Sequence, residues 1–143
     1  MVVDLTKLEP EQILEFKRQL TTEVDHLQTS FQALKTAQAK YQECGDNVRQ
    51  VNSSSKKELL VPLTSSLYVP GKIKENDKFL IDVGTGYYIE KDTKQSLEFF
   101  QARLTKLDED SKKLEQLINE KSQVVERVNG ILRSKIMERE KKQ

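Results

Sequence analysis

The stretch from Glu58 to Lys91 constrains the fold of this chain more than any other. It reads ELLVPLTSSLYVPGKIKENDKFLIDVGTGYYIEK, is rich in β-branched and aromatic residues, and is punctuated by Pro and Gly. The long segments on either side are highly charged and contain almost no Pro or Gly. Strand-forming runs separated by turn residues predict β-hairpins. We therefore expect a small β insert between two long helices.

The two flanking segments have the apolar spacing of a coiled coil. In the first, gaps of three and four residues alternate, with one extra gap of four between Leu20 and Val24, which is a stutter that locally relaxes the supercoil. In the second, an unbroken heptad seam runs through residues 97–132, and its two polar positions, Ser111 and Lys121, predict the loosest packing there. A flanking stripe is expected to thicken this second seam, and it consists of Leu117, Val124 and Ile131.

Folding the two segments back on each other buries the two seams. Charged residues make up 33% of the chain, hydrophobic residues only 36%, and Trp is absent, which argues against a large globular core. The predicted fold class is mainly α, a long antiparallel coiled-coil hairpin with two central β-hairpins that join an oligomeric β-barrel. The expected parts are an N-terminal coiled-coil helix in residues 1–55, paired β-hairpins in 56–91, and a C-terminal coiled-coil helix in 92–143.

Within the insert, four short strands are expected, at about Glu58–Leu63, Leu67–Lys72, Lys78–Val83 and Tyr87–Lys91. Isolated hairpins are marginal in water, and this insert holds more apolar side chains than two hairpins can shelter. Each such side chain gains roughly 1.5–3 kcal/mol on full burial, so strands of partner subunits in a shared barrel would stabilise it. The insert therefore predicts an obligate oligomer. The residues expected at subunit contacts are Leu60, Val61, Leu63, Leu67, Val69, Ile73, Phe79, Leu80, Ile81, Val83, Tyr87, Tyr88 and Ile89.

At these residues the chain resembles the prefoldin family of ATP-independent hexameric co-chaperones. ELLVPLTSSLYVPGKI (58–73) followed by FLIDVGTGYYIEKD (79–92) is similar to the paired-hairpin signature of its α-class subunits. The resemblance implies a heterohexamer with one further α-class and four β-class subunits, joined by a double β-barrel from which six coiled coils extend. It also implies capture of non-native proteins, such as actin and tubulin chains, and their delivery to the cytosolic chaperonin. The implied location is cytoplasmic, and nuclear presence is left open.

The antiparallel fold places the start of the chain beside residues 131–137, far from the insert. That end carries more apolar groups than the hairpin can bury, and exposed apolar helix ends bind unfolded chains weakly. Several such ends acting together gain avidity through effective concentration. Four of these residues have an equally simple role in closing the coiled coil, namely Ile13, Phe16, Leu132 and Ile136. The full set of candidate client-binding residues is Val2, Val3, Leu5, Leu8, Ile13, Phe16, Ile131, Leu132, Ile136 and Met137.

No enzyme, metal site or cofactor is predicted. His26 is the only histidine and lies beside the seam, and Cys44 has no His or second Cys near it in sequence. Residues 84–86 (GTG) lack the Lys-Ser/Thr of a phosphate loop and predict a hairpin turn. The 24 basic and 23 acidic residues are interleaved, which gives no basic face for nucleic acid, and no run is apolar enough for a membrane span.

A second functional class is compatible with the same pattern, namely a coiled-coil adaptor or scaffold subunit that binds one folded partner. The unbalanced apolar ends favour the chaperone, because an adaptor would more often present a defined polar and aromatic patch. The two functions differ in what the chain binds: a chaperone binds several unrelated denatured proteins, whereas an adaptor binds one native partner.

Overall fold

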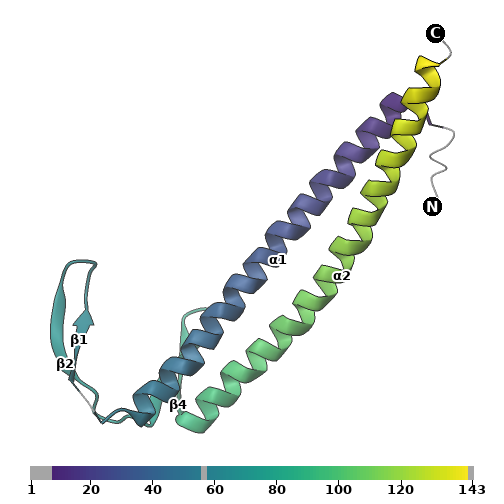
Figure 1. Cartoon of the computed structure of the whole chain (residues 1–143). Helices are drawn as coiled ribbons and strands as arrows, with labels where there is room; N and C mark the ends of the chain where they lie inside the picture. The colour runs from purple at the N-terminus through teal and green to yellow at the C-terminus, as the bar shows by residue number, and fades with distance from the viewer. Residues whose placement is uncertain (1–7, 56–57, 142–143) are drawn as a thin grey trace. The chain divides into compact units, whose positions relative to one another are not determined.

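The structure is a computed structural model that describes residues 8–55 and 58–141. Its elements, in chain order, are α1 (Pro10–Ser53), β1 (Glu58–Pro62), β2 (Tyr68–Lys72), β3 (Lys78–Gly84), β4 (Tyr87–Asp92) and α2 (Thr93–Glu140) (Figure 1). The predicted fold class is confirmed, because two long helices flank two antiparallel β-hairpins in sequence. All four strands occur where they were expected, with ends within one residue of the predicted bounds.

Hydrogen bonds at the first turn of each helix explain where the helices begin. The backbone N–H of Glu9 donates to the side-chain carbonyl of Gln12 at 3.1 Å, just before Pro10 opens α1. At α2, the backbone N–H of Gln95 donates to Oδ1 of Asp92 at 2.7 Å, and the N–H of Asp92 donates back to Oε1 of Gln95 at 3.2 Å. This reciprocal arrangement is a capping box, and Asp92 and Gln95 have the spacing of three residues that it requires.

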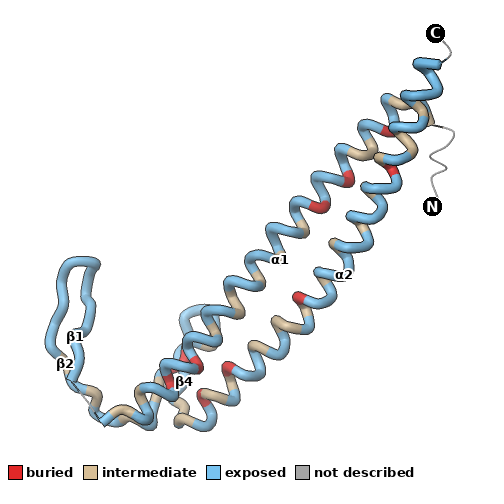
Figure 2. Tube along the Cα trace, in the orientation of Figure 1, coloured by how far each residue is buried: buried red, intermediate tan, exposed pale blue. Residues whose placement is uncertain are grey.

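The chain forms two compact units. We call Met1–Thr36 with Asp108–Gln143 the coiled-coil unit, and Ala37–Leu107 the hairpin unit. In the coiled-coil unit, segments of α1 and α2 lie side by side and antiparallel (Figure 1). Buried and half-buried positions together recur along both segments at the seam spacing, so the predicted seams are confirmed (Figure 2). The buried cluster of this unit comprises Ile13, Leu20 and Val128, against which Leu8, Phe16, Val125, Ile131 and Leu132 pack.

The hairpin unit has a separate small core. Val48 from the end of α1, Ile81 from β3 and Phe100 from the start of α2 are its buried members. The rings of Tyr41 and Phe100 lie with their centroids 6.2 Å apart, and Phe99 meets Phe100 edge-on at 5.4 Å. One face of the β3–β4 hairpin is therefore fixed against both helices.

The flanking stripe of α2 differs from expectation. Leu117 and Val124 are exposed, and Ile131 alone of the three packs against the buried cluster. The prediction that this stripe thickens the seam is wrong for Leu117 and Val124, because α1 covers only the seam positions of α2. Ser111, where loose packing was predicted, is only 1% exposed.

Candidate functional site

The β1–β2 hairpin is apolar on both faces and open on both. β1 pairs antiparallel with β2, from Glu58 opposite Lys72 to Pro62 opposite Tyr68. Alternate residues of a strand point to opposite sides, so Leu59 and Leu60 lie on different faces, yet both are exposed. A hairpin with apolar groups exposed on both sides leaves more apolar surface open than soluble monomers usually do.

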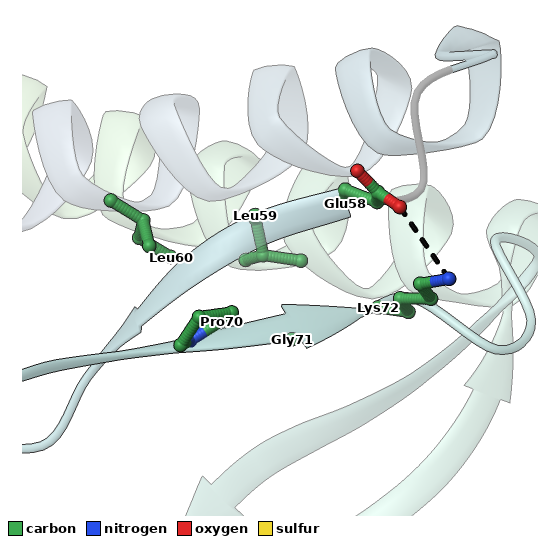
Figure 3. Close-up of a pocket in the computed structure, with 6 residues that line it drawn as sticks. All are labelled: Glu58, Leu59, Leu60, Pro70, Gly71 and Lys72. Carbon is green, nitrogen blue, oxygen red and sulfur yellow. Dashed lines mark ion pairs between the residues drawn. The ribbon is translucent and has the colours of Figure 1, made fainter.

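A close backbone approach shapes this hairpin. A Cβ built on Gly71 would lie 2.8 Å from Cγ2 of Val61, so only glycine leaves room for that valine. An open hollow of about 440 Å³ lies beside it, lined by Glu58, Leu59, Leu60, Pro70, Gly71 and Lys72 (Figure 3). Lys72 and Glu58 pair at 3.4 Å at one end of the hollow, while the leucines and Pro70 supply its apolar lining. The hollow is thus an apolar recess with a charged rim.

The β3–β4 hairpin is apolar on both faces too, but its own chain covers part of one face. Ile81 is buried in the core of the hairpin unit, while Leu80, on the opposite face, is exposed, as are Tyr87 and Tyr88. The turn is formed by residues 84–86, all with positive φ, including Thr85 at 52°. The side chain of Asp82 accepts a hydrogen bond from the N–H of Gly84 at 2.9 Å, which fixes the turn. A hairpin turn was predicted here, and one is found.

Most residues predicted at subunit contacts are exposed in the single chain. Ile81 is the exception, because it is buried by the chain's own helices, and Ile73, Phe79 and Val83 are half-buried. The exposed members are Leu60, Val61, Leu63, Leu67, Val69, Leu80, Tyr87, Tyr88 and Ile89. Their role in subunit contacts stays a prediction.

Sequence reasoning missed three residues of this region. Leu59 and Tyr68 are as exposed as their predicted neighbours, and reading β1 as a strand with two open faces would have included both. Asn52 joins three segments: its carbonyl accepts from the side chain of Asn76 at 3.1 Å, and its Oδ1 accepts from the hydroxyl of Thr93 at 3.1 Å. Asn52 therefore ties the end of α1 to the loop before β3 and to the start of α2. No sequence signal pointed to that role.

The candidate client-binding residues divide by burial. Ile13 is fully buried, and Leu8, Phe16, Ile131 and Leu132 are half-buried around the same cluster. In this conformation Ile13 therefore has no surface to offer a client, as expected of a residue that closes the coiled coil. The exposed members are Ile136 and Met137, the latter 62% exposed. Val2, Val3 and Leu5 lie outside the described residues.

Contacts between the helices hold this end of the coiled-coil unit together. The side chain of Arg139 pairs with Glu9 at 2.5 Å, and the ammonium of Lys135 donates to the carbonyl of Leu8. We call the segments 8–16 and 131–140 the tip. The tip thus has a closed interior with Ile136 and Met137 on its surface.

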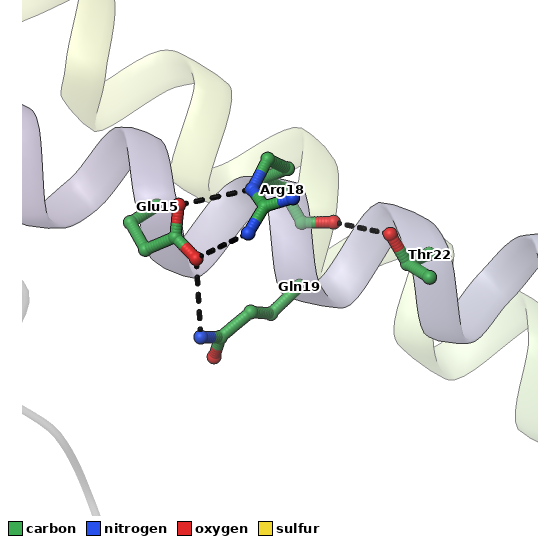
Figure 4. A network of polar contacts seen from close by, with 4 residues as sticks. All are labelled: Glu15, Arg18, Gln19 and Thr22. Atoms are coloured by element: carbon green, nitrogen blue, oxygen red, sulfur yellow. Dashed lines mark hydrogen bonds and ion pairs between the residues drawn. The ribbon is translucent and has the colours of Figure 1, made fainter.

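Other charged residues pair within a single helix. Arg18 donates to both carboxylate oxygens of Glu15, at 2.9 and 2.8 Å, while Gln19 also donates to Glu15 and Thr22 donates to the carbonyl of Arg18 (Figure 4). The hydrogen bonds from Arg18 lower the pKa of Glu15, and the same contacts raise the pKa of Arg18. These exposed pairs within one helix are typical of a solvated face and stabilise it only weakly.

The described residues show no cluster of three or more His, Cys, Asp or Glu side chains that could hold a metal ion. Within the same residues, no helix is long and apolar enough to cross a membrane. Cys44 is exposed, and His26 lines an open hollow of about 280 Å³ beside Lys121.

Comparison with known proteins agrees with this architecture. A sequence model of the family Prefoldin, described as prefoldin subunit, matches residues 20–137. The chain is 40% identical over 137 residues to prefoldin subunit 5 of Homo sapiens, covering 95% of this chain and 89% of that protein. It is 43% identical over 138 residues to probable prefoldin subunit 5 of Schizosaccharomyces pombe, covering 93% and 88%.

Among solved structures, the chain resembles one from the cryo-EM structure of filamentous PFD from Methanocaldococcus jannaschii. The TM-score is 0.69 at 22% sequence identity, and the match covers 79% of this chain and 94% of that one. At this identity the likeness concerns the fold, namely two long helices with β-hairpins between them.

Proposed function

Because this chain belongs to the prefoldin family, as its sequence predicted, we propose that it is a subunit of the ATP-independent, heterohexameric co-chaperone prefoldin. In this proposal it assembles with one further α-class and four β-class subunits through its two hairpins. It captures unfolded proteins at the tip of its coiled coil. The observation that carries the proposal is the exposure of apolar residues on both faces of β1–β2 and on the outer face of β3–β4.

Assembly follows from the cost of leaving those groups in water. Leu60, Leu80, Tyr87 and Tyr88 are each more than half exposed in the single chain. Full burial of one such side chain gains roughly 1.5–3 kcal/mol, and soluble monomers rarely expose a patch of this kind. Each two-stranded sheet also has free edges, which strands of neighbouring subunits would pair with. A shared β-barrel would bury the apolar side chains and also pair the free strand edges.

Client capture follows from the composition of the tip. Leu14, Ile136 and Met137 are exposed there, next to a closed coiled coil. Exposed apolar side chains on a helix end bind an unfolded chain weakly and with little selectivity. Six tips on one platform raise the effective concentration, so weak contacts add up to useful affinity. In this proposal, clients such as nascent actin and tubulin then pass to the cytosolic chaperonin, and the protein acts in the cytoplasm. No catalytic step is assigned to the chain.

The test replaces apolar tip residues with charge and leaves the hairpins intact. We expect Ile136→Glu with Met137→Glu to leave the mass of the assembled complex unchanged and to abolish suppression of aggregation for several unrelated denatured proteins. The control is Leu117→Glu with Val124→Glu, which makes the same number of substitutions at exposed apolar residues of α2 away from the tip. Unchanged suppression by the tip variant would refute client capture at these residues. Binding of a single folded partner instead would favour an adaptor.

A further inference from the structure

The polar position Lys121 in the seam of α2 lies level with the stutter of α1. Its ammonium meets the carboxylate of Glu23 at 2.5 Å, and Glu23 immediately precedes Val24, the residue that ends the stutter. Leu20 and Val24 are both buried, so the seam of α1 continues through the stutter. The stutter in the seam of α1 and the charged seam position of α2, Lys121, therefore lie at the same level of the coiled coil.

A stutter turns the apolar face of one helix relative to a partner that keeps a strict heptad. An apolar side chain of α2 at this level would not meet its packing pocket between side chains of α1, because the stutter has turned that face of α1 away. A lysine suits the position, because its stem can stay in the seam while its charged head reaches the flank. The Lys121 side chain is 31% exposed, and the open hollow of about 280 Å³ noted above is lined by Glu23, His26, Leu27, Ser30 and Lys121. The packing is thus incomplete here, and the ion pair spans the gap.

We propose that the Lys121–Glu23 ion pair fixes the register of α1 against α2 in the coiled-coil unit. A polar residue at a single seam position commonly specifies register, at a cost in stability. Here the specificity comes from the partner: the residues that precede the adjacent seam positions Leu20 and Leu27 are Gln19 and His26, and neither is a carboxylate. A slip of one heptad would bring Lys121 level with Phe31, which follows the uncharged Ser30, or with Phe16, which follows Glu15, a carboxylate that already accepts hydrogen bonds from Arg18.

Register matters for the proposed client surface, although the ion pair's role does not depend on that function. A slip of one heptad moves each residue of α2 by about 10 Å along α1, since an α-helix rises about 1.5 Å per residue. Ile136 and Met137 would then sit at a different level from Leu14. The ion pair is therefore a positioning device for the tip.

The test measures register directly as a distance between two spin labels. The labels go on Glu11→Cys in α1 and Gln116→Cys in α2, both exposed and both in the coiled-coil unit, with Cys44→Ser to remove the native thiol. The labelled chain is assembled with its partner subunits before measurement. We expect one dominant distance for the otherwise unchanged chain, with a minor component displaced by about 10 Å. With Lys121→Leu we expect the displaced component to grow.

The population with the shifted register should rise about fivefold in Lys121→Leu. This ratio corresponds to the largest free energies measured for exposed ion pairs. The charge-reversed chain, Lys121→Glu with Glu23→Lys, should return to one dominant distance, which a purely space-filling role of the lysine would not predict. Glu23→Gln keeps the shape and removes the charge, so it carries the test if Lys121→Leu does not fold. No growth of the displaced component in the folded Lys121→Leu chain or in Glu23→Gln, or failure of the reversed pair to restore the dominant distance, would overturn the proposal.

Discussion

Leu60→Asp should prevent this chain from joining its complex. Leu60 lies in β1 and is 63% exposed in the single chain, so other subunits would have to cover most of its surface. Full burial of a leucine gains roughly 1.5–3 kcal/mol, and the exposed part accounts for about 1–2 kcal/mol of that. An unpaired carboxylate in the same place adds a desolvation cost of several kcal/mol. The sum of at least about 4 kcal/mol corresponds to roughly a thousandfold weaker association.

The assay is the mass of the complex, measured by sedimentation after co-expression with the partner subunits. Leu14→Asp is the matched control, because Leu14 is 55% exposed on α1 and lies in no strand. It should assemble normally. If Leu60→Asp assembles as well as Leu14→Asp, other chains do not cover the β1–β2 hairpin, and the assembly surface has been assigned wrongly.

Three further changes test the local structure. Ser111→Ala should raise the melting temperature of the complex by a few degrees, because the buried hydroxyl has no hydrogen-bond partner and its desolvation costs about 1–3 kcal/mol; a fall would mean that the hydroxyl is satisfied. Asp92→Ala should destabilise the start of α2 by about 1 kcal/mol through loss of the hydrogen bond to Gln95, seen as faster amide exchange in the first turn, and unchanged exchange would contradict it. Gly71→Ala should weaken assembly by about 1–3 kcal/mol, because the new methyl group displaces Val61 in the hairpin, and a complex as resistant to dilution as the parent would argue against that contact.

The helices and strands could be predicted because their signals are local. Seam spacing identified both helices, and Pro, Gly and turn residues bounded all four strands to within a residue. The capping box at Asp92 and Gln95 is also a short-range pattern, and the structure contains it. Family resemblance was visible for the same reason, because the paired hairpins concentrate in one continuous stretch.

Burial was harder to predict, because it depends on what lies opposite a residue. Nothing local distinguishes Ile13, which is fully buried, from Ile136, which is exposed at the same tip. Leu117 and Val124 suggested a wider seam, but a single partner helix leaves them open. Asn52 carried no sequence signal of its role, because its contacts with Asn76 and Thr93 arise only when distant segments meet. Contacts between segments that are distant in the sequence can be identified only once the fold is known.

The most direct test of the account is the native mass and subunit content of the complex that a tagged form of this chain forms in its own cells. The account predicts a heterohexamer in which this chain is joined by other small coiled-coil subunits with β-hairpins. A homodimer, or a complex with one large folded partner, would contradict it, because the exposed hairpins would then serve a different assembly.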